Sequence, residues 1–214
     1  MSITRDLYSS RREIVWLADA LQECLGFPQQ VRARIGCELV TIHRWGIGKA
    51  WESMRGAPGT AAYTVHSALD RIRVPYRIVV STAIPNATVI LHAMAPGSGR
   101  ASTAISARDI GFVRARLKDV ELDRRQPRDS GLPRVCQVEA TGNPFLQLGF
   151  ASADADEWMR RAELIAELRQ DLRRRAEDGH ASLECRAILA GDIEALSCET
   201  LLGVAGRVQA SRWI

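Results

Sequence analysis

The sequence predicts an α+β protein, in which a small antiparallel sheet with helices packed mainly on one face is followed by a small all-helical domain. Short runs rich in β-branched residues cluster in the first half, and Val74–Ser81 and Thr88–Met94 are the clearest. Apolar residues recur at helical spacing in Asp154–Arg175. The stretch between these regions is charged and contains Pro and Gly, as linkers often do. We therefore expect a first domain at residues 1–120, a linker at 121–142 and a second domain at 143–214.

The start of the chain predicts a strand and two helices. Arg12–Leu17 is a short apolar run typical of a strand, and Ala18–Leu25 is helical until Gly26-Phe27-Pro28 stops it. Pro28 suits the first turn of the next helix, where a missing N–H loses no hydrogen bond. An apolar stripe runs along that helix, at Val31, Ile35, Leu39 and Ile42. Polar residues fill its other faces, namely Gln29, Gln30, Arg32, Arg34 and Glu38.

The rest of the first domain predicts a loop, three strands and a helix. Gly46–Gly59 is expected to be a loop, because it contains four glycines and a proline. Ala61–Ser67 joins the two clear strands in the sheet, and Pro85-Asn86 suits the turn between those two. Ala107–Lys118 closes the domain as a helix whose inward residues are Ile110 and Val113 or Leu117.

The second domain predicts a long helix followed by two short ones. The long helix places its apolar residues along one side, at Trp158, Ala162, Ile165 and Leu168 or Leu172. Ser182–Ala190 predicts a short helix, and Gly191-Asp192 a turn. Ser197–Val208 predicts the last helix, with Ser197 as its N-cap.

Positive charge is concentrated in the first domain. Residues 1–120 hold 16 Lys/Arg and 9 Asp/Glu, a net charge of +7, whereas residues 121–214 hold 13 and 16, a net charge of −3. A basic surface is what a polyanion-binding protein needs, and an acidic second domain would complement it. The alternative is that the two surfaces carry unrelated, solvated charges.

The composition favours a cytoplasmic protein without a membrane span. No apolar run reaches about 18 residues, and the first residues lack the apolar core of a signal peptide. The cysteines number five and form no Cys-x-x-Cys pair, so the pattern favours neither a disulfide framework nor a zinc site.

Four segments of the first domain occur in an order that resembles the RelE/HigB-type toxins, and more narrowly their phage Gp49-like branch. They are FPQQVRARIGCEL (Phe27–Leu39), SMRG (Ser53–Gly56), PYRIVVS…TVILHAM (Pro75–Met94) and ARDIGFVRARLK (Ala107–Lys118). In the second domain, residues 143–175 and 196–214 are similar to the beginning and end of Xre/HigA-type helix-turn-helix antitoxins. The resemblance implies a compact mRNA-interferase fold that cuts RNA without a metal or cofactor, joined to a shortened antitoxin.

The resemblance and the residue chemistry together give five candidate site residues. Arg55, Arg77 and His92 are candidates for catalysis, and His66 and Arg100 for RNA binding, because an RNase needs cations on the phosphate and a group that moves a proton. The alternatives are a surface arginine for Arg77 and a packed, hydrogen-bonded histidine for His92. The family carries lysines after the strand that ends at Met94, whereas this chain reaches its first cation only at Arg100.

Two functions follow as expectations. The first is a fused toxin–antitoxin protein, in which the RNase-like domain is neutralised in cis. The second is a non-catalytic binding or regulatory protein descended from such a pair, because the lysines are missing. Residues 180–195 yield one clear helix, so we do not expect sequence-specific DNA binding from one copy. RNA or the ribosome, a protein partner or a second copy are the expected partners.

Overall fold

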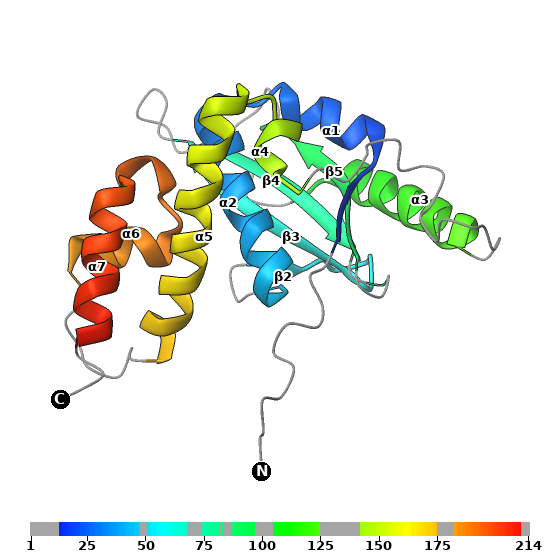
Figure 1. Ribbon diagram of the computed structural model, residues 1–214. Coiled ribbons are helices and arrows are strands. Elements are labelled where there is room, and N and C mark those ends of the chain that lie inside the picture. The colour runs from blue at the N-terminus through cyan, green and yellow to red at the C-terminus, as the bar shows by residue number, and fades with distance from the viewer. Residues whose placement is uncertain are drawn as a thin grey trace, which may run out of the picture.

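The computed structural model describes residues 13–47, 51–67, 74–81, 83, 87–96, 105–124, 142–174 and 182–210. Within them the chain is α+β, as predicted, with a five-stranded sheet and helices on both of its faces (Figure 1). The first part contains β1 (Glu13–Trp16), α1 (Ala18–Leu25), α2 (Gln29–Trp45), β2 (Trp51–Ser53), β3 (Thr60–Ser67), β4 (Val74–Ser81), β5 (Ala87–Met94) and α3 (Ala107–Arg124). The second part contains α4 (Pro144–Gln147), α5 (Ser152–Arg174), α6 (Leu183–Ala190), the 3₁₀ turn η2 (Ile193–Ala195) and α7 (Cys198–Ala210).

The sheet is mixed, so the prediction of an antiparallel sheet was wrong for one strand. Its order is β1-β5-β4-β3-β2, and every neighbouring pair from β5 to β2 is antiparallel. β1 runs parallel to β5, with Glu13 opposite Ala87 and Trp16 opposite Ile90. Two helices and three strands separate β1 from β5 along the chain. No tight turn therefore fixes their relative direction, and local sequence carries no signal for it.

The segment Gly46–Gly59, predicted to be a loop, contains the edge strand β2. Trp51 lies opposite Tyr63 of β3, and their rings stack with centroids 5.2 Å apart. Three residues are too few to show an alternating pattern, so this strand depends on a tertiary contact for its position.

Helices cover both faces of the sheet, which corrects the prediction of one main face. All eight residues of β5 are buried, and successive side chains of a strand point to opposite faces. Ala93, Ile78 and Tyr63 lie opposite one another on three neighbouring strands and so share one face of the sheet. That face is the one toward α2, because Tyr63 interacts electrostatically with Glu38 of α2. His92 points to the other face, where its ring lies 6.1 Å from Phe112 of α3.

Helix α2 lies at the centre of the molecule, between the sheet and the second part. Its predicted apolar stripe is buried, and so are Gly36, Glu38 and Val40 on its other side. Glu38, predicted to lie on a polar face of this helix, is buried because α5 packs against that side of α2. The hydrophobic core consequently runs without interruption from the sheet into α4–α7.

The predicted helices of the second part are confirmed, with small changes of boundary. Ser182 caps α6 by accepting a hydrogen bond from the Cys185 N–H, and Ser197 caps α7 by accepting one from Thr200 N–H. The short helix α4 was not predicted, although the Asn143 side chain caps it. Helix α3 continues to Arg124, six residues beyond the predicted end. In the part of the chain that the structure describes, no helix is long and apolar enough to cross a membrane.

Candidate functional site

The structure places three of the five candidate site residues on one face of the sheet. Arg77 of β4 lies opposite Thr64 of β3 and Met94 of β5, while His92 lies opposite Val79. Since side chains two residues apart share a face, Arg77, His66 and His92 all project to the face that α3 covers. Diagonal neighbours of this kind have Cα atoms about 7–8 Å apart, which puts Arg77 and His92 within reach of one extended ligand.

The other two candidates do not join this group. Arg55 is exposed in the turn between β2 and β3, near Thr60. Thr60 lies four positions, or about 13 Å of strand, before Thr64, the residue opposite Arg77. Arg100 lies outside the described residues, as does the predicted turn at Pro85-Asn86. The described candidates therefore form a group of three, with Arg55 at a distance.

His92 is held between an acidic side chain of α1 and an acidic side chain of α3. Its Nδ1 lies 2.7 Å from Glu23 Oε2, and its Nε2 lies 3.7 Å from Asp109 Oδ1. Arg116 of α3 donates to Glu23 Oε1 at 2.9 Å, and its other terminal nitrogen lies 3.1 Å from His92 Nδ1. The side chain of His92 is only 11% exposed. We call Glu23, His92, Asp109 and Arg116 the histidine cluster.

Two members of the histidine cluster satisfy backbone groups of β5 that have no strand beside them. The last hydrogen bond from the β1 side is donated by Leu17 N–H to Ile90 O. Beyond that point, Arg116 donates to Leu91 O at 2.9 Å, and Glu23 Oε2 accepts the Ala93 N–H at 2.9 Å. Leaving a buried backbone group without a hydrogen bond costs free energy. Glu23 and Arg116 therefore provide, beyond the end of β1, the hydrogen bonds that a neighbouring strand would otherwise provide.

The electrostatics of Glu23 follow from these contacts. Burial alone would raise the pKa of its carboxyl, but hydrogen bonds from His92, Arg116 and the Ala93 N–H outweigh burial and lower that pKa to about 2. Glu23 is therefore ionised at neutral pH and accepts only, which directs an N–H of His92 toward it. The imidazole of His92 thus has one nitrogen committed to a structural contact.

Local sequence explains one member of the cluster, and tertiary packing explains the others. Ser106 accepts the Asp109 N–H at 3.1 Å and donates to Asp109 Oδ2 at 2.6 Å, which caps the first turn of α3. A Ser followed three residues later by an acidic residue is a recognisable cap signal. Glu23 and Arg116 lie 93 positions apart, and nothing in the sequence pairs them.

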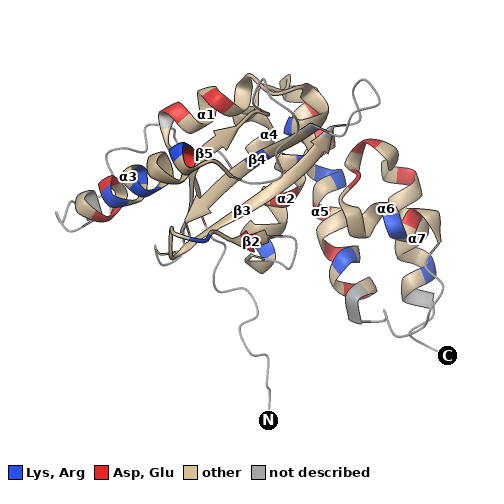
Figure 2. Cartoon of the chain, turned by 180° about the vertical axis from the view of Figure 1, so that it is seen from behind, with Lys and Arg blue, Asp and Glu red and all other residues tan. Residues whose placement is uncertain are grey.

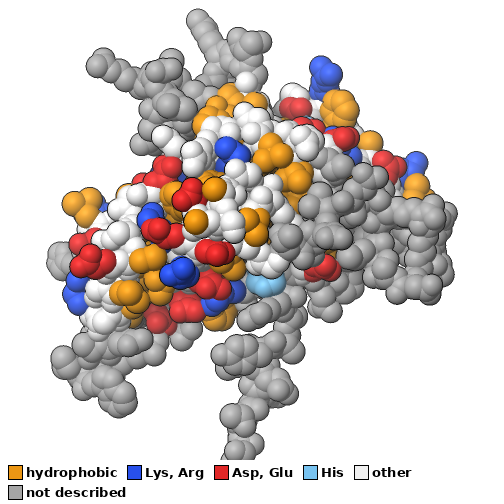
Figure 3. Space-filling model, turned by 45° about the horizontal axis from the view of Figure 1, so that its top comes forward, with side chains coloured by type: hydrophobic (Ala, Val, Ile, Leu, Met, Phe, Trp, Pro, Cys, Tyr) orange, Lys and Arg blue, Asp and Glu red, His pale blue; other side chains and the backbone are white. Residues whose placement is uncertain are grey.

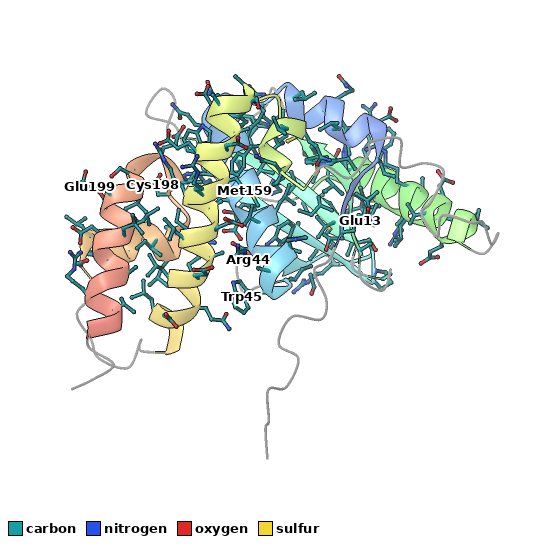
Figure 4. All side chains as sticks on the ribbon, in the orientation of Figure 1. Glu13, Arg44, Trp45, Met159, Cys198 and Glu199 are labelled. Carbon is teal, nitrogen blue, oxygen red and sulfur yellow. The ribbon has the colours of Figure 1, made fainter. Side chains whose placement is uncertain are left out.

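A second set of polar contacts joins α2 to the second part of the chain. Arg44 donates to Glu163 and, at 2.6 Å, to Glu167 of α5, and it lies at the end of α2 beside α5 (Figure 4). Arg34 forms an ion pair with Asp192 at 3.0 Å, and Arg32 donates to Leu148 O. Arg32 and Arg34, which were predicted to lie on the polar faces of α2, and Arg44 at its end therefore contact the second part.

A buried ion pair lies at the centre of this interface. Arg169 of α5 donates to Glu38 of α2, and the two side chains are 3% and 4% exposed. The Nε of Arg169 also donates to Ile188 O at 2.7 Å. Burial opposes the charge of Arg169, but the carboxylate of Glu38 outweighs it and raises the pKa of the guanidinium. Sequence reasoning missed both roles, because each residue alone is a normal helix-surface residue.

Close packing completes the interface at Gly36. The Phe145 ring of α4 lies so near that a Cβ at Gly36 would be 2.5 Å from its Cε1. Phe145 itself is fully buried, with Trp158 stacked at 6.3 Å. The second part thus inserts an aromatic side chain against the backbone of α2.

The histidine cluster and the α2 interface lie on different sides of the molecule. Helix α3 lies at the end of the molecule away from α6 and α7 in two opposite views (Figures 1 and 2). On the face seen in Figure 3, basic and acidic side chains are interspersed rather than gathered into a field of one sign. The described helices of the second part pack against α2, directly or through α5, on the opposite face of the sheet, so they do not cover the group formed by Arg77, His66 and His92.

In the part of the chain that the structure describes, no group of three or more His, Cys, Asp and Glu side chains is arranged to hold a metal ion. Comparisons with protein-family models, with curated proteins and with solved structures found no match.

Proposed function

We propose that this chain is a fused toxin–antitoxin-type protein, in which an RNase-like first part is held in cis by its helical second part. The observation that carries the proposal is the interface on α2. There, arginines of the basic first part bind carboxylates of the acidic second part around a shared hydrophobic core. Complementary charges of this kind are expected if the second part binds the first specifically.

The second part would act on the first through α2 rather than by covering the candidate RNA face. The group formed by Arg77, His66 and His92 lies on the face of the sheet opposite α2. Restraint in cis would then come from fixing the position of α2 and of the sheet beneath it. A tether makes the docking intramolecular, so the second part stays bound without any excess of a separate antitoxin.

Separate production of the two parts tests this proposal. Residues 1–124, produced alone, are expected to arrest growth and to yield cleaved mRNA, and co-production of residues 142–214 is expected to restore growth. Circular dichroism of the purified first part shows whether it is folded. A folded first part that leaves growth and mRNA intact would refute the RNase role.

A second function is favoured by the state of His92. Its imidazole is 11% exposed and contacts Glu23, Arg116 and Asp109, and Glu23 and Arg116 also satisfy the backbone of β5. Such a histidine suits a structural role, and the chain would then be a non-catalytic binding protein descended from a toxin–antitoxin pair. RNA is the partner that we propose for the face that carries Arg77.

Binding and cleavage by the full chain separate the two functions. A non-catalytic protein is expected to bind a single-stranded RNA of mixed sequence without cutting it, and Arg77→Ala is expected to weaken that binding. His92→Gln would leave RNA binding unchanged. Cleavage of the same RNA by the wild-type chain, lost in His92→Gln, would contradict the non-catalytic function.

A further inference from the structure

The histidine cluster places two carboxylates beside an imidazole that, when neutral, has only one N–H. Glu23 faces Nδ1 and Asp109 faces Nε2 of the same ring. A neutral imidazole carries one N–H, whereas the imidazolium carries two. In either neutral form, one carboxylate therefore faces a nitrogen lone pair, and only the protonated ring can donate to Glu23 and also form an ion pair with Asp109.

The two carboxylates belong to different helices, so the charge of the ring has a structural consequence. Glu23 is on α1, and it also holds the Ala93 N–H and Arg116. Its 2.7 Å contact with Nδ1 is the shorter of the two, which assigns the single N–H of the neutral ring to Glu23. The 3.7 Å contact with Asp109 is then the one that depends on protonation.

Asp109 is also part of the cap of α3. Ser106 and Asp109 exchange hydrogen bonds around the first turn of the helix. We propose that the charge of His92 sets how strongly this capped first turn of α3 is tied to β5 and α1. Imidazole is the side chain whose charge normally changes between about pH 5 and 8, so the tie would respond to pH in that window.

The charged groups around the ring act in both directions. Carboxylates favour the imidazolium, and the guanidinium of Arg116 beside Nδ1 opposes it. Arg116 is itself neutralised, because it donates to Glu23 and lies 3.4 Å from Asp19. The charged residues that face or neighbour the ring are Asp19 and Glu23 on α1, Arg108, Asp109 and Arg116 on α3, and Arg77 on β4.

Hydrogen exchange of the full chain tests the proposal. After correction for the intrinsic chemical rate, amides 110–113 are expected to exchange about two- to fivefold more slowly at pH 6 than at pH 8, the size that a partly exposed ion pair supplies. Asp109→Asn keeps the shape and the Ser106 contact, and it should abolish this difference. Asp119→Asn, an exposed carboxylate on the same helix, is the matched control and should retain it.

A second measurement tests the contact between His92 and Asp109 directly, in case Asp109→Asn changes hydrogen exchange only by weakening the helix. The His92 ring is titrated by NMR in the wild type and in Asp109→Asn, where its midpoint is expected to fall because a favourable carboxylate is lost. His92→Gln should show no pH dependence in the exchange of amides 110–113. An unchanged exchange ratio in Asp109→Asn, or an unchanged titration midpoint, would overturn the proposal.

Discussion

The buried pair between Glu38 and Arg169 gives the sharpest test of how the two parts are joined. Arg169→Met removes the partner of a carboxylate that is 4% exposed, and it also removes the hydrogen bond from Arg169 Nε to Ile188 O, which then keeps only the Gly191 N–H. Breaking a buried ion pair costs about 3–5 kcal/mol, because the remaining charge stays desolvated. Glu38→Leu is expected to destabilise the chain as well, because it leaves the buried guanidinium of Arg169 without its carboxylate.

The double variant distinguishes a pair from two independent contacts. Replacing both residues, as Glu38→Leu with Arg169→Met, leaves no isolated charge and fills the space with apolar atoms. Such replacements are often neutral or even stabilising. We therefore expect the double variant to be more stable than Arg169→Met alone, with a coupling free energy of about 3 kcal/mol or more.

Urea unfolding of the full chain, followed by circular dichroism, measures these changes in the free energy of unfolding. Arg160→Met on the exposed side of α5 is the matched control, and its effect should stay within about 0.5 kcal/mol. A loss below about 1 kcal/mol for Arg169→Met, or a double variant whose loss equals the sum of the single losses, would refute the reasoning.

Four further outcomes follow from the structure. Gly36→Ala should lower the free energy of unfolding by about 1–2 kcal/mol in urea unfolding, because its Cβ would overlap the Phe145 ring. Gly111→Ala, with open space around its Cβ, should instead raise that free energy by about 0.5–1 kcal/mol. The pKa of Glu23 is lowered from its ordinary value of 4.5 to about 2, so its ionised carboxylate stabilises the fold at pH values above 4.5, and this stabilisation is lost as the pH falls from 4.5 toward 2. Glu23→Gln should therefore lack this loss of stability in an acid titration of unfolding. Burial raises the pKa of the Cys24 thiol to about 12, so a thiol reagent at pH 8 should leave Cys24 unmodified until the chain is unfolded.

The candidate site shows which functional contacts a sequence can reveal. Arg77 alternates with Tyr76 and Ile78 along β4, so the sequence alone places it on the opposite face of the strand from them, and the register agrees with that placement. The charge difference between the two halves indicated complementary surfaces, but it did not identify α2 as the helix that carries them. Specific pairings required the tertiary structure, because residues that meet across the interface are more than a hundred positions apart in the chain.

The sequence by itself determined the α-helices other than α4, four of the five strands and the α+β class. These features depend on local periodicity and on caps such as Ser182 and Ser197, which act within a few residues. Only the tertiary structure decided that β1 runs parallel to β5, that β2 forms, and that α2 is buried on both sides. Each of these depends on contacts between distant segments, whose geometry no short stretch of sequence specifies. The same holds for His92, whose surroundings come from α1 and α3 and decide what its imidazole can do.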